Sequence, residues 1–300
     1  MNKILLVLVV LLTGVTFISF IEKEDETNFN LIEKEKTIKI LKDDKILNLN
    51  LEDYIVGVVA GEMPASFEEE ALKAQAVASR SYALYKKKTS EGSYDLTGDI
   101  SNQVYLTKEE MKDKWMEDYD YYYDKVRNAV YKTKGEVITY NGEIIKAFYF
   151  SMSNGHTEDS LSVFKESNEY LKSVDSIYDN NSLKNYSVET IFKRDEFKNK
   201  LGITCDNFDN PHIEYDDSHY VKSIKLCDKS FTGINLREKL SLRSASFDIN
   251  INDDIKITTY GYGHGVGLSQ YGANGYAKNG YDYKEILKHY YTNIKLESIN

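Results

Sequence analysis

The sequence predicts an α+β fold, with a mixed or antiparallel sheet, packed helices and a transmembrane helix at the N-terminus. Three observations support this prediction. Two segments carry the alternating pattern of a β-hairpin, and one of them contains Asn141-Gly142, a strong hairpin-turn signal. Several other segments repeat apolar residues with the period of an amphipathic helix. Residues 4–21 contain no charged side chain, which is typical of a membrane-spanning segment.

Composition excludes several classes of protein. The chain has 48 acidic against 38 basic residues and a formal net charge of −10, so nucleic acid is not an expected partner. Hydrophobic residues make up 41% of the sequence, which is too many for a disordered chain. A charged fraction of 29% excludes a membrane protein with many spans. Internal repeats are absent, which argues against solenoids and propellers.

The N-terminus predicts an anchor in the cell membrane. At a rise of about 1.5 Å per residue, residues 4–21 are long enough to cross most of the hydrocarbon core. Lys3 precedes this run and acidic residues follow it, which places the rest of the chain on the extracytoplasmic side. A cleaved signal peptide is the alternative, but the small residues of a cleavage site are missing. The predicted parts are an anchor at 1–21, a tether at 22–36 and an extracytoplasmic domain at 37–300.

The first half of the domain predicts two hairpins and three helices. A hairpin at 38–51 is followed by a short helix at 52–61, which stops before Pro64. Ser66 and Glu69 have the spacing of a capping box, and after them a longer helix continues to about residue 87. The other elements expected here are a helix at 118–134, ended by Gly135, and a hairpin at 136–150.

The second half is harder to interpret. Residues 177–231 are rich in polar side chains and predict only one strand, at 220–226, so the role of residues 176–235 stays open. Beyond them the pattern predicts strands at 246–252 and 254–260, a glycine-rich loop, and helices at 268–278 and 283–290.

Two cysteines lie in this second half. Cys205 and Cys227 enclose His212 and His219, and together the four supply ligand types that bind zinc. Every gap between them is six or seven residues, whereas structural zinc sites bring ligands in close pairs. A disulfide or two free thiols are therefore preferred over zinc.

Glu62 is the first candidate for chemistry. It stands where a mainly apolar helix ends against a proline turn, so its carboxyl group is expected to be partly desolvated and to favour the protonated form. A proton donor needs that environment. The alternative is that Glu62 caps a turn or pairs with a lysine.

Two further segments could form a site. Four glycines surround His264 in residues 261–267, but the spacing of a phosphate-binding loop is missing, and a tight connection with a structural histidine is the alternative. Ser153 and His156 raise the possibility of a serine hydrolase. That interpretation is weak, because no nucleophile elbow surrounds the serine.

Three segments of this chain resemble the stage II sporulation protein D family, whose domain is shared with amidase-enhancer proteins. They are residues 53–64 (DYIVGVVAGEMP) continuing through 70–82 (EALKAQAVASRSY), residues 150–158 (FSMSNGHTE) and residues 263–273 (GHGVGLSQYGA). Shorter matches at 103–105 (QVY) and 170–172 (YLK) occur in the same order. The resemblance covers about residues 38–296 and is slight at 176–235.

This resemblance implies a lytic transglycosylase acting on peptidoglycan glycan strands during sporulation engulfment. Its acid/base is the glutamate of the Glu-Met-Pro motif, here Glu62. One carboxyl is enough, because the attacking oxygen is the muramoyl 6-hydroxyl of the substrate, whereas most glycoside hydrolases need two. The resemblance also implies a set of substrate-binding residues, which are Arg80, Tyr170, Lys172, His264, Ser269 and Gln270.

The resemblance implies partners and no cofactor. The partners are stage II sporulation proteins P and M. Some family members hold cysteine and histidine before the Gln-Val-Tyr motif, but this chain has Thr97, Ser101 and Asn102 there, so no metal is expected.

His264 is expected to form a hydrogen bond across the cleft to the element that carries Glu62. The alternative function is a noncatalytic wall-binding enhancer of an amidase.

Overall fold

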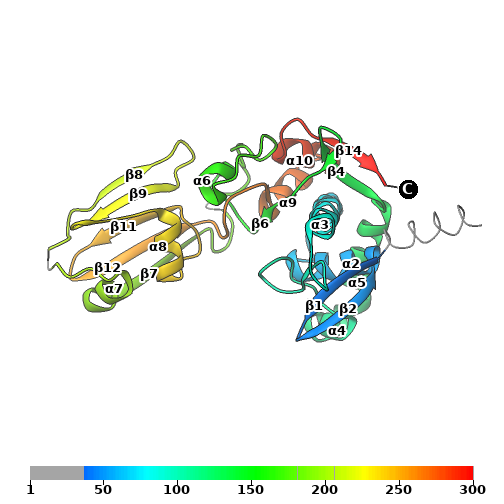
Figure 1. Cartoon of the computed structure of the whole chain (residues 1–300), viewed down its shortest axis with the longest axis horizontal. Helices are drawn as coiled ribbons and strands as arrows, with labels where there is room; N and C mark the ends of the chain where they lie inside the picture. Colours follow the sequence, from blue (N-terminus) through cyan, green and yellow to red (C-terminus); the bar gives the residue numbers. More distant parts are fainter. Residues whose placement is uncertain (1–36, 181, 206, 300) are drawn as a thin grey trace, which may run out of the picture.

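The chain folds into two lobes, each with its own hydrophobic core. The computed structural model describes residues 37–180, 182–205 and 207–299. We call residues 187–260 the inserted lobe, and residues 37–180 with 261–299 the main lobe. The two lobes form opposite ends of an elongated molecule (Figure 1). The expected mixture of helices and strands is confirmed, although the strands form several small sheets instead of one.

The main lobe begins with a hairpin that leads directly into a buried helix. Strand β1 (Thr37–Lys42) pairs antiparallel with β2 (Lys45–Asn50) and parallel with β3 (Leu96–Thr97). The Asn50 side chain caps α2 (Leu51–Glu62) by accepting the N–H of Glu52 at 3.0 Å. Because the residue before a proline avoids helical geometry, Met63 is extended and the helix ends at Glu62.

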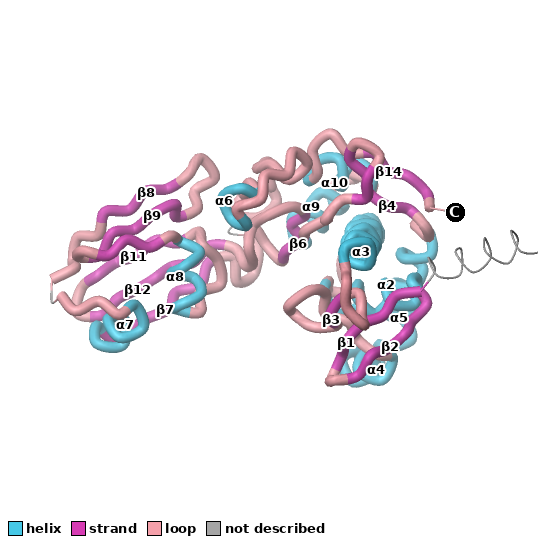
Figure 2. The backbone as a smooth tube through the Cα atoms, viewed as in Figure 1, coloured by secondary structure: helices cyan, strands magenta, loops and turns pink. Residues whose placement is uncertain are grey.

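Helix α3 (Glu69–Thr89) is the centre of the main lobe (Figure 2). It contacts α2, α5, α9, α10 and β4, and its alanine-rich middle is buried on every side. Close approach of so many elements requires small side chains. The predicted capping box is wrong: the helix begins at Glu69, the N-cap is Glu68, and no side chain caps it. Ser66 therefore lies too early in the sequence to reach the helix.

The remaining elements surround α3. Two helices and a 3₁₀ turn follow the first sheet: α4 (Lys108–Trp115), η1 (Met116–Asp118) and α5 (Tyr119–Lys132). A second small sheet has the order β14-β4-β5, with strands β4 (Glu136–Tyr140), β5 (Glu143–Ile144) and β14 (Lys295–Ser298). Helices α6 (Ser160–Phe164), α9 (Gln270–Lys278) and α10 (Tyr283–Tyr290) complete the lobe.

The predicted hairpin at 136–150 is correct at its turn and wrong at its end. Asn141 and Gly142 both have positive φ, as that turn type requires. Strand β5 stops at Ile144, however, and the chain re-forms a strand only at β6 (Tyr149–Phe150), which pairs in parallel with β13 (Leu268–Ser269). This parallel pair joins the segment at 150–158 to the glycine-rich segment at 263–273.

The inserted lobe contains two antiparallel three-stranded sheets. Their orders are β10-β9-β8 and β11-β12-β7. The strands are β7 (Ser187–Lys193), β8 (His212–Tyr215), β9 (Val221–Leu226), β10 (Lys229–Phe231), β11 (Phe247–Ile251) and β12 (Asp254–Tyr260). Two helices pack with them, α7 (Arg194–Leu201) and α8 (Gly233–Leu240). The predicted strands at 220–226, 246–252 and 254–260 are confirmed.

Cys205 and Cys227 form a disulfide in the inserted lobe. It fastens the loop after α7 to the turn between β9 and β10. The pairing resolves the three alternatives left open by the sequence, because neither sulfur remains as a thiol or zinc ligand. Within the described ranges, no three His, Cys, Asp or Glu side chains gather as a metal site would require.

The predicted anchor at 1–21 and tether at 22–36 lie outside the described residues. Of the helices between residues 37 and 299 that the structure describes, none combines the length and apolar character needed to span a bilayer.

Candidate functional site

Glu62 lies at the C-terminal end of α2, where a crossing segment covers the helix. Residues 103–105 pack closely against α2 at two glycines. A Cβ on Gly61 would collide with the carbonyl oxygen of Val104, and one on Gly57 would collide with the ring of Tyr105. The glycines of the sequence motif therefore allow this segment to lie directly beside the glutamate.

The Glu62 carboxyl group is held by hydrogen bonds in a largely dry setting. Its Oε1 accepts the backbone N–H of Val104 at 2.6 Å, and the Tyr149 side chain also hydrogen-bonds to it. Burial is the largest influence and raises the pKa of Glu62 to about 7, although Val104, Tyr149 and the charge of Lys114 each lower it. The residue as a whole is partly exposed. Glu62 is thus accessible, and its pKa suits both donating and accepting a proton near neutral pH.

A buried amide fixes the orientation of Tyr149. Gln103 Nε2 donates to the Tyr149 hydroxyl at 2.9 Å and to the carbonyl oxygen of Ser79 at 3.2 Å, while the Tyr54 hydroxyl donates to Gln103 Oε1 at 3.0 Å. A carbonyl oxygen only accepts, so Ser79 determines which end of the Gln103 amide carries the nitrogen. With its oxygen accepting from Gln103, the Tyr149 hydroxyl keeps its own hydrogen free to donate, and Glu62 is one partner for it.

Gln270 is connected to this site by buried hydrogen bonds that pass through α3. Its Nε2 donates to Gln75 Oε1 at 3.2 Å, and Gln75 Nε2 donates to Ser79 Oγ at 2.9 Å. Ser79 is in turn bonded to Gln103 through its carbonyl oxygen. All four residues are buried. Gln270 was predicted to line the groove. It is instead a buried residue that supports Gln103 through this chain of hydrogen bonds.

Ser269 belongs to a separate buried cluster around Asp179. One oxygen of that carboxyl, Oδ2, accepts from the hydroxyls of Ser269 at 2.5 Å, Ser153 at 2.8 Å and Ser176 at 2.9 Å. The cluster joins the segment at 150–158 to the N-terminus of α9. Ser153 is therefore a donor inside the protein, and His156 instead faces Asp175 at 3.1 Å. The serine hydrolase interpretation is wrong, because the serine and the histidine are not paired.

Arg80 does not lie in an open groove as expected. Its side chain is fully buried and donates to both carboxyl oxygens of Glu52, at 3.0 and 2.6 Å. It also donates to the backbone oxygens of Glu136 and Val130. A guanidinium with no exposed surface has nothing to offer a glycan. The structure therefore gives Arg80 a different place, as the buried ion-pair partner that joins α3 to α2, α5 and β4.

His264 is held by its own loop and by β6. Nδ1 accepts the N–H of Val266 at 3.1 Å, the ring hydrogen-bonds to the backbone of Tyr149, and it packs among the rings of Phe148, Phe150 and Phe164. The predicted bond to the element carrying Glu62 is wrong, because these bonds go to the loop itself and to β6 and not to α2. Burial, helped by the charge of Arg237, lowers the pKa of His264 to about 4, so the ring is neutral at neutral pH.

Tyr170 and Lys172 are half-buried and bond to groups other than Glu62. The Tyr170 hydroxyl accepts the N–H of Lys146 at 3.4 Å, and Lys172 forms ion pairs with Asp159 at 3.4 Å and Glu169 at 3.6 Å. None of these bonds reaches Glu62, so the structure does not bring the two residues to it directly.

A second carboxyl with a raised pKa lies between the lobes. Burial and a hydrogen bond with the Asp216 carboxyl raise the pKa of Glu158 to about 8. The pair lines a cavity of about 420 Å³. The Asp216 carboxyl disfavours a negative charge on its neighbour, so Glu158 holds its proton at neutral pH. Asp216 lies in the part of the sequence that carries little resemblance to any motif, and no signal pointed to it.

Sequence reasoning also missed Tyr149, Tyr54 and Asp179 as site residues. Tyr149 precedes the segment at 150–158 by one position, and Tyr54 and Gln103 lie inside motifs that carry the family resemblance. Their roles depend on side-chain direction, which motif matching does not supply.

Comparisons with known proteins agree with the motifs. A family model described as "Stage II sporulation protein" matches residues 42–140. Stage II sporulation protein D of Bacillus subtilis is 39% identical over 257 residues, which are 83% of this chain and 75% of that protein. The protein of the same name from Bacillus amyloliquefaciens is 40% identical, with 83% and 74% covered. An amidase enhancer of Bacillus subtilis is 28% identical, and the match covers 81% of this chain but 40% of the enhancer.

Proposed function

Since the chain belongs to the stage II sporulation protein D family, we propose that it is a lytic transglycosylase that cleaves peptidoglycan glycan strands during sporulation engulfment. One observation carries the proposal: Glu62 is accessible, yet its carboxyl is dry enough for a pKa of about 7. An ordinary surface glutamate is ionised at neutral pH and donates no proton.

In the proposed reaction Glu62 serves twice. Its protonated carboxyl first gives a proton to the glycosidic oxygen as the bond from that oxygen to C1 of muramic acid breaks. The resulting carboxylate then takes the proton of the muramoyl 6-hydroxyl, whose oxygen forms a new bond to C1. The products are a shortened strand and a 1,6-anhydro end, and Glu62 is protonated again. Val104 and Tyr149 stabilise the carboxylate between these two steps.

The groups that act on Glu62 favour this reaction over hydrolysis. The groups that shift the pKa of Glu62 are Val104, Tyr149 and Lys114, and none of them is a second acid. Hydrolysis of a glycosidic bond usually requires two carboxyls about 5–10 Å apart, one of which activates water or forms a covalent intermediate. A substrate hydroxyl removes that requirement.

The proposal extends to the surroundings of the domain. We place it outside the cytoplasm on a membrane anchor at residues 1–21, where stage II sporulation proteins P and M are its partners. Tyr170 and Lys172 expose polar groups that could contact the strand beyond the reacting bond. A neutral His264 fastens the glycine-rich loop to β6 and takes no part in proton transfer.

A second candidate is a noncatalytic enhancer of an amidase. It is favoured by the 28% identity with a protein of that name. An enhancer needs to bind the wall but not to cleave it. The two candidates differ in whether the purified chain releases soluble fragments without an amidase present.

Turnover of purified, peptide-free glycan strands tests the proposal. Glu62→Gln keeps the shape of the side chain but carries no transferable proton, so turnover should fall by about 10²- to 10⁴-fold. Glu68→Gln is the matched control, because Glu68 is an exposed glutamate six residues away. Absence of turnover by the wild-type protein, or turnover by Glu62→Gln above about a tenth of wild type, would contradict an enzymatic role for Glu62.

A further inference from the structure

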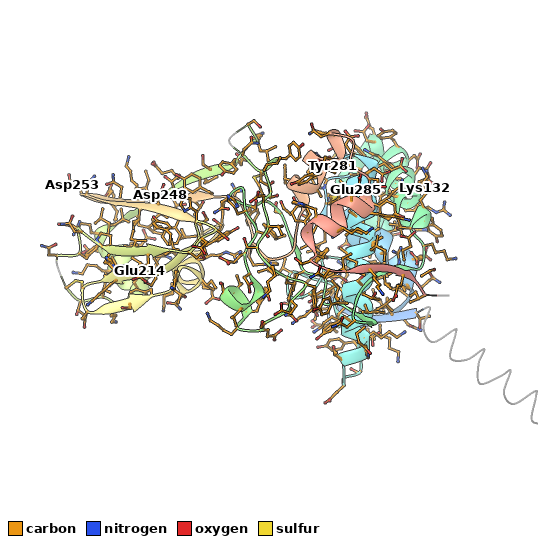
Figure 3. The ribbon with its side chains drawn as sticks, turned by 90° about the horizontal axis from the view of Figure 1, so that it is seen from above. Lys132, Glu214, Asp248, Asp253, Tyr281 and Glu285 are labelled. Carbon is orange, nitrogen blue, oxygen red and sulfur yellow. A yellow bond between two sulfur atoms is a disulfide. The ribbon has the colours of Figure 1, made fainter. Side chains whose placement is uncertain are left out.

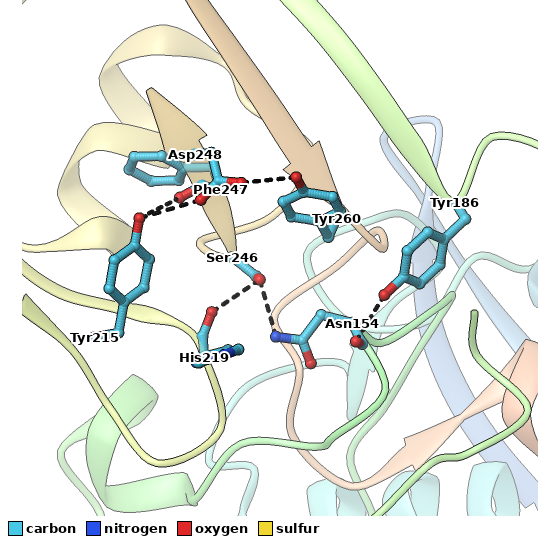
Figure 4. Close-up of a pocket in the computed structure, with 8 residues that line it drawn as sticks. All are labelled: Asn154, Tyr186, Tyr215, His219, Ser246, Phe247, Asp248 and Tyr260. Carbon is cyan, nitrogen blue, oxygen red and sulfur yellow. Dashed lines mark hydrogen bonds between the residues drawn. The ribbon is translucent and has the colours of Figure 1, made fainter. Parts of the chain in front are cut away.

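A second pocket lies at the base of the inserted lobe. It is a cavity of about 360 Å³, which falls at the lower end of the roughly 300–1,000 Å³ typical of small-molecule sites. Its lining residues are Asn154, Tyr186, Tyr215, His219, Ser246, Phe247, Asp248 and Tyr260 (Figure 4). Neither Glu62 nor any residue that acts on its carboxyl is among them, so the pocket is separate from the site described above.

Aromatic rings form the walls of this pocket. Tyr186 and Tyr260 form one tilted pair, with ring centroids 6.1 Å apart, and Tyr215 and His219 form another at 6.1 Å. Figure 4 shows Tyr215 and Tyr186 on opposite sides, with Asp248 and Tyr260 between them. Tyrosine presents an apolar face and a polar edge, so such walls can hold a ligand that has both kinds of surface.

One carboxylate connects the two walls. Asp248 accepts the hydroxyl of Tyr260 at 2.7 Å through one oxygen and the hydroxyl of Tyr215 at 3.3 Å through the other. The bond to Asp248 is the main cause that raises the pKa of Tyr260 to about 12, so this phenol stays neutral and donating. A carboxylate offers about four acceptor positions. Asp248, which is exposed, therefore has capacity left for hydroxyl groups of a ligand.

The floor of the pocket is rigid. Asn154 Nδ2 donates to Ser246 Oγ at 2.9 Å and to the carbonyl oxygen of Ser218 at 2.8 Å. Ser246 Oγ donates to the carbonyl oxygen of His219 at 2.9 Å, which helps to hold His219 at a φ of 61°. Left-handed backbone is uncommon outside glycine. The bonds fix the pocket before any ligand arrives, and such preorganisation lowers the cost of binding.

We propose that this pocket binds one pyranose ring of an N-acetylated amino-sugar strand and holds the strand at a distance from Glu62. The choice of ligand class rests on the proposed function. A pyranose has a flat face of C–H groups that packs on an aromatic ring, and an edge of hydroxyls that a carboxylate accepts. A cationic amine is the other chemistry that rings and a carboxylate hold, through cation–π contact.

The test follows the pocket directly by NMR, without requiring cleavage. Chitotriose, a peptide-free trimer of N-acetylglucosamine, is added to the full chain carrying Glu62→Gln. The imidazole signal of His219 is assigned by its loss in His219→Asn. We expect chitotriose to shift this signal, and we expect Tyr215→Ala to weaken binding at the pocket roughly fivefold to tenfold.

Tyr281→Ala is the matched control, since Tyr281 is 42% exposed against 41% for Tyr215. Tyr281 lies in the main lobe, far from Asp248 (Figure 3). This variant should bind like the parent protein. Butylammonium serves as the probe for the alternative ligand, a cationic amine. The proposal would be overturned if chitotriose leaves the His219 signal unmoved, or if the signal moves only with butylammonium.

The test distinguishes failure of the sugar site from failure of the proposed function. If the wild-type protein releases no fragments but chitotriose shifts the His219 signal, the sugar site stands and the transglycosylase does not. If the protein cleaves strands while the His219 signal stays in place, the sugar site is lost and the enzyme remains. In a cleaving protein, Tyr215→Ala should raise KM on long strands and leave kcat within about twofold, because its ring makes no contact with Glu62.

Discussion

Glu62 and Glu158 both have raised pKa values, but for different reasons. Burial alone raises the pKa of Glu62, while three nearby groups favour the charged carboxylate and lower it. The pKa of Glu158 is raised by burial and also by a second acid, Asp216, and these effects outweigh the hydrogen bonds from Asp159 and Ser162 that lower it. The first arrangement stabilises the carboxylate once it forms. In the second, the neighbouring Asp216 opposes the carboxylate, so Glu158 is suited to remaining protonated.

This difference makes Glu62 the better suited of the two carboxyls for the proposed acid and base roles. A group that must give up a proton and take it back needs both states to be close in energy, as its partners arrange for Glu62. The backbone around Glu158 instead joins two loops, because its N–H donates to the carbonyl oxygen of Gly265 at 2.7 Å. We interpret the Glu158–Asp216 pair as part of the contact between the lobes.

Substitution of each glutamate by glutamine gives the largest contrast. Glu62→Gln should lose about 10²- to 10⁴-fold in turnover. Glu158→Gln should stay within about tenfold, because a neutral amide resembles the protonated acid it replaces. Turnover of glycan strands, with thermal unfolding to confirm the fold, checks both variants. Equal losses in two folded variants would break the distinction.

The pH dependence of turnover should follow Glu62. Below its pKa of about 7 the carboxyl holds the proton needed for the first step, so the single-turnover rate should be flat. Above that pH it should fall about tenfold per unit.

The stability of the fold should also depend on the protonation of Glu62. The folded protein holds this proton more tightly than the unfolded chain. The contribution of Glu62 to stability is therefore lost as the pH rises from 4.5 to about 7.

Tyr149→Phe should have a smaller effect with a distinctive sign. Removing the hydroxyl takes away a hydrogen bond that favours the carboxylate, so the pKa of Glu62 should rise further, by about one unit. The falling limb of the pH profile should move to higher pH, while turnover drops roughly tenfold or less. Tyr121→Phe, at a residue 66% exposed, is the control. An unmoved limb would mean that Tyr149 does not act through Glu62.

The sequence predicted Glu62 better than it predicted the residues around it. An apolar helix that ends before Pro64 implies desolvation, and the raised pKa agrees with that expectation. The supporting Tyr149 and Gln103 come from other segments, and the parallel pairing of β6 with β13 fixes where Tyr149 lies. Local patterns contain no information about such pairing.

Arg80 and the inserted lobe show where sequence patterns fail. Helical spacing placed Arg80 on α3 but did not indicate which neighbour it faces, and its partner Glu52 lies in a different helix, 28 residues earlier. In the inserted lobe, strands such as β10 have only three residues. Segments that short carry too little periodicity to recognise, and their burial comes from partners distant in the sequence.

The chemical nature of the new chain end tests the central claim most directly. Purified glycan strands are incubated with the protein, and the products are divided into two samples, one of which is reduced with borohydride before mass analysis. If a substrate hydroxyl is the acceptor and Glu62 serves as both acid and base, the new ends are 1,6-anhydromuramic acid and do not change on reduction. New ends that are mainly reducible muramic acid would show that water is the acceptor and would contradict the account.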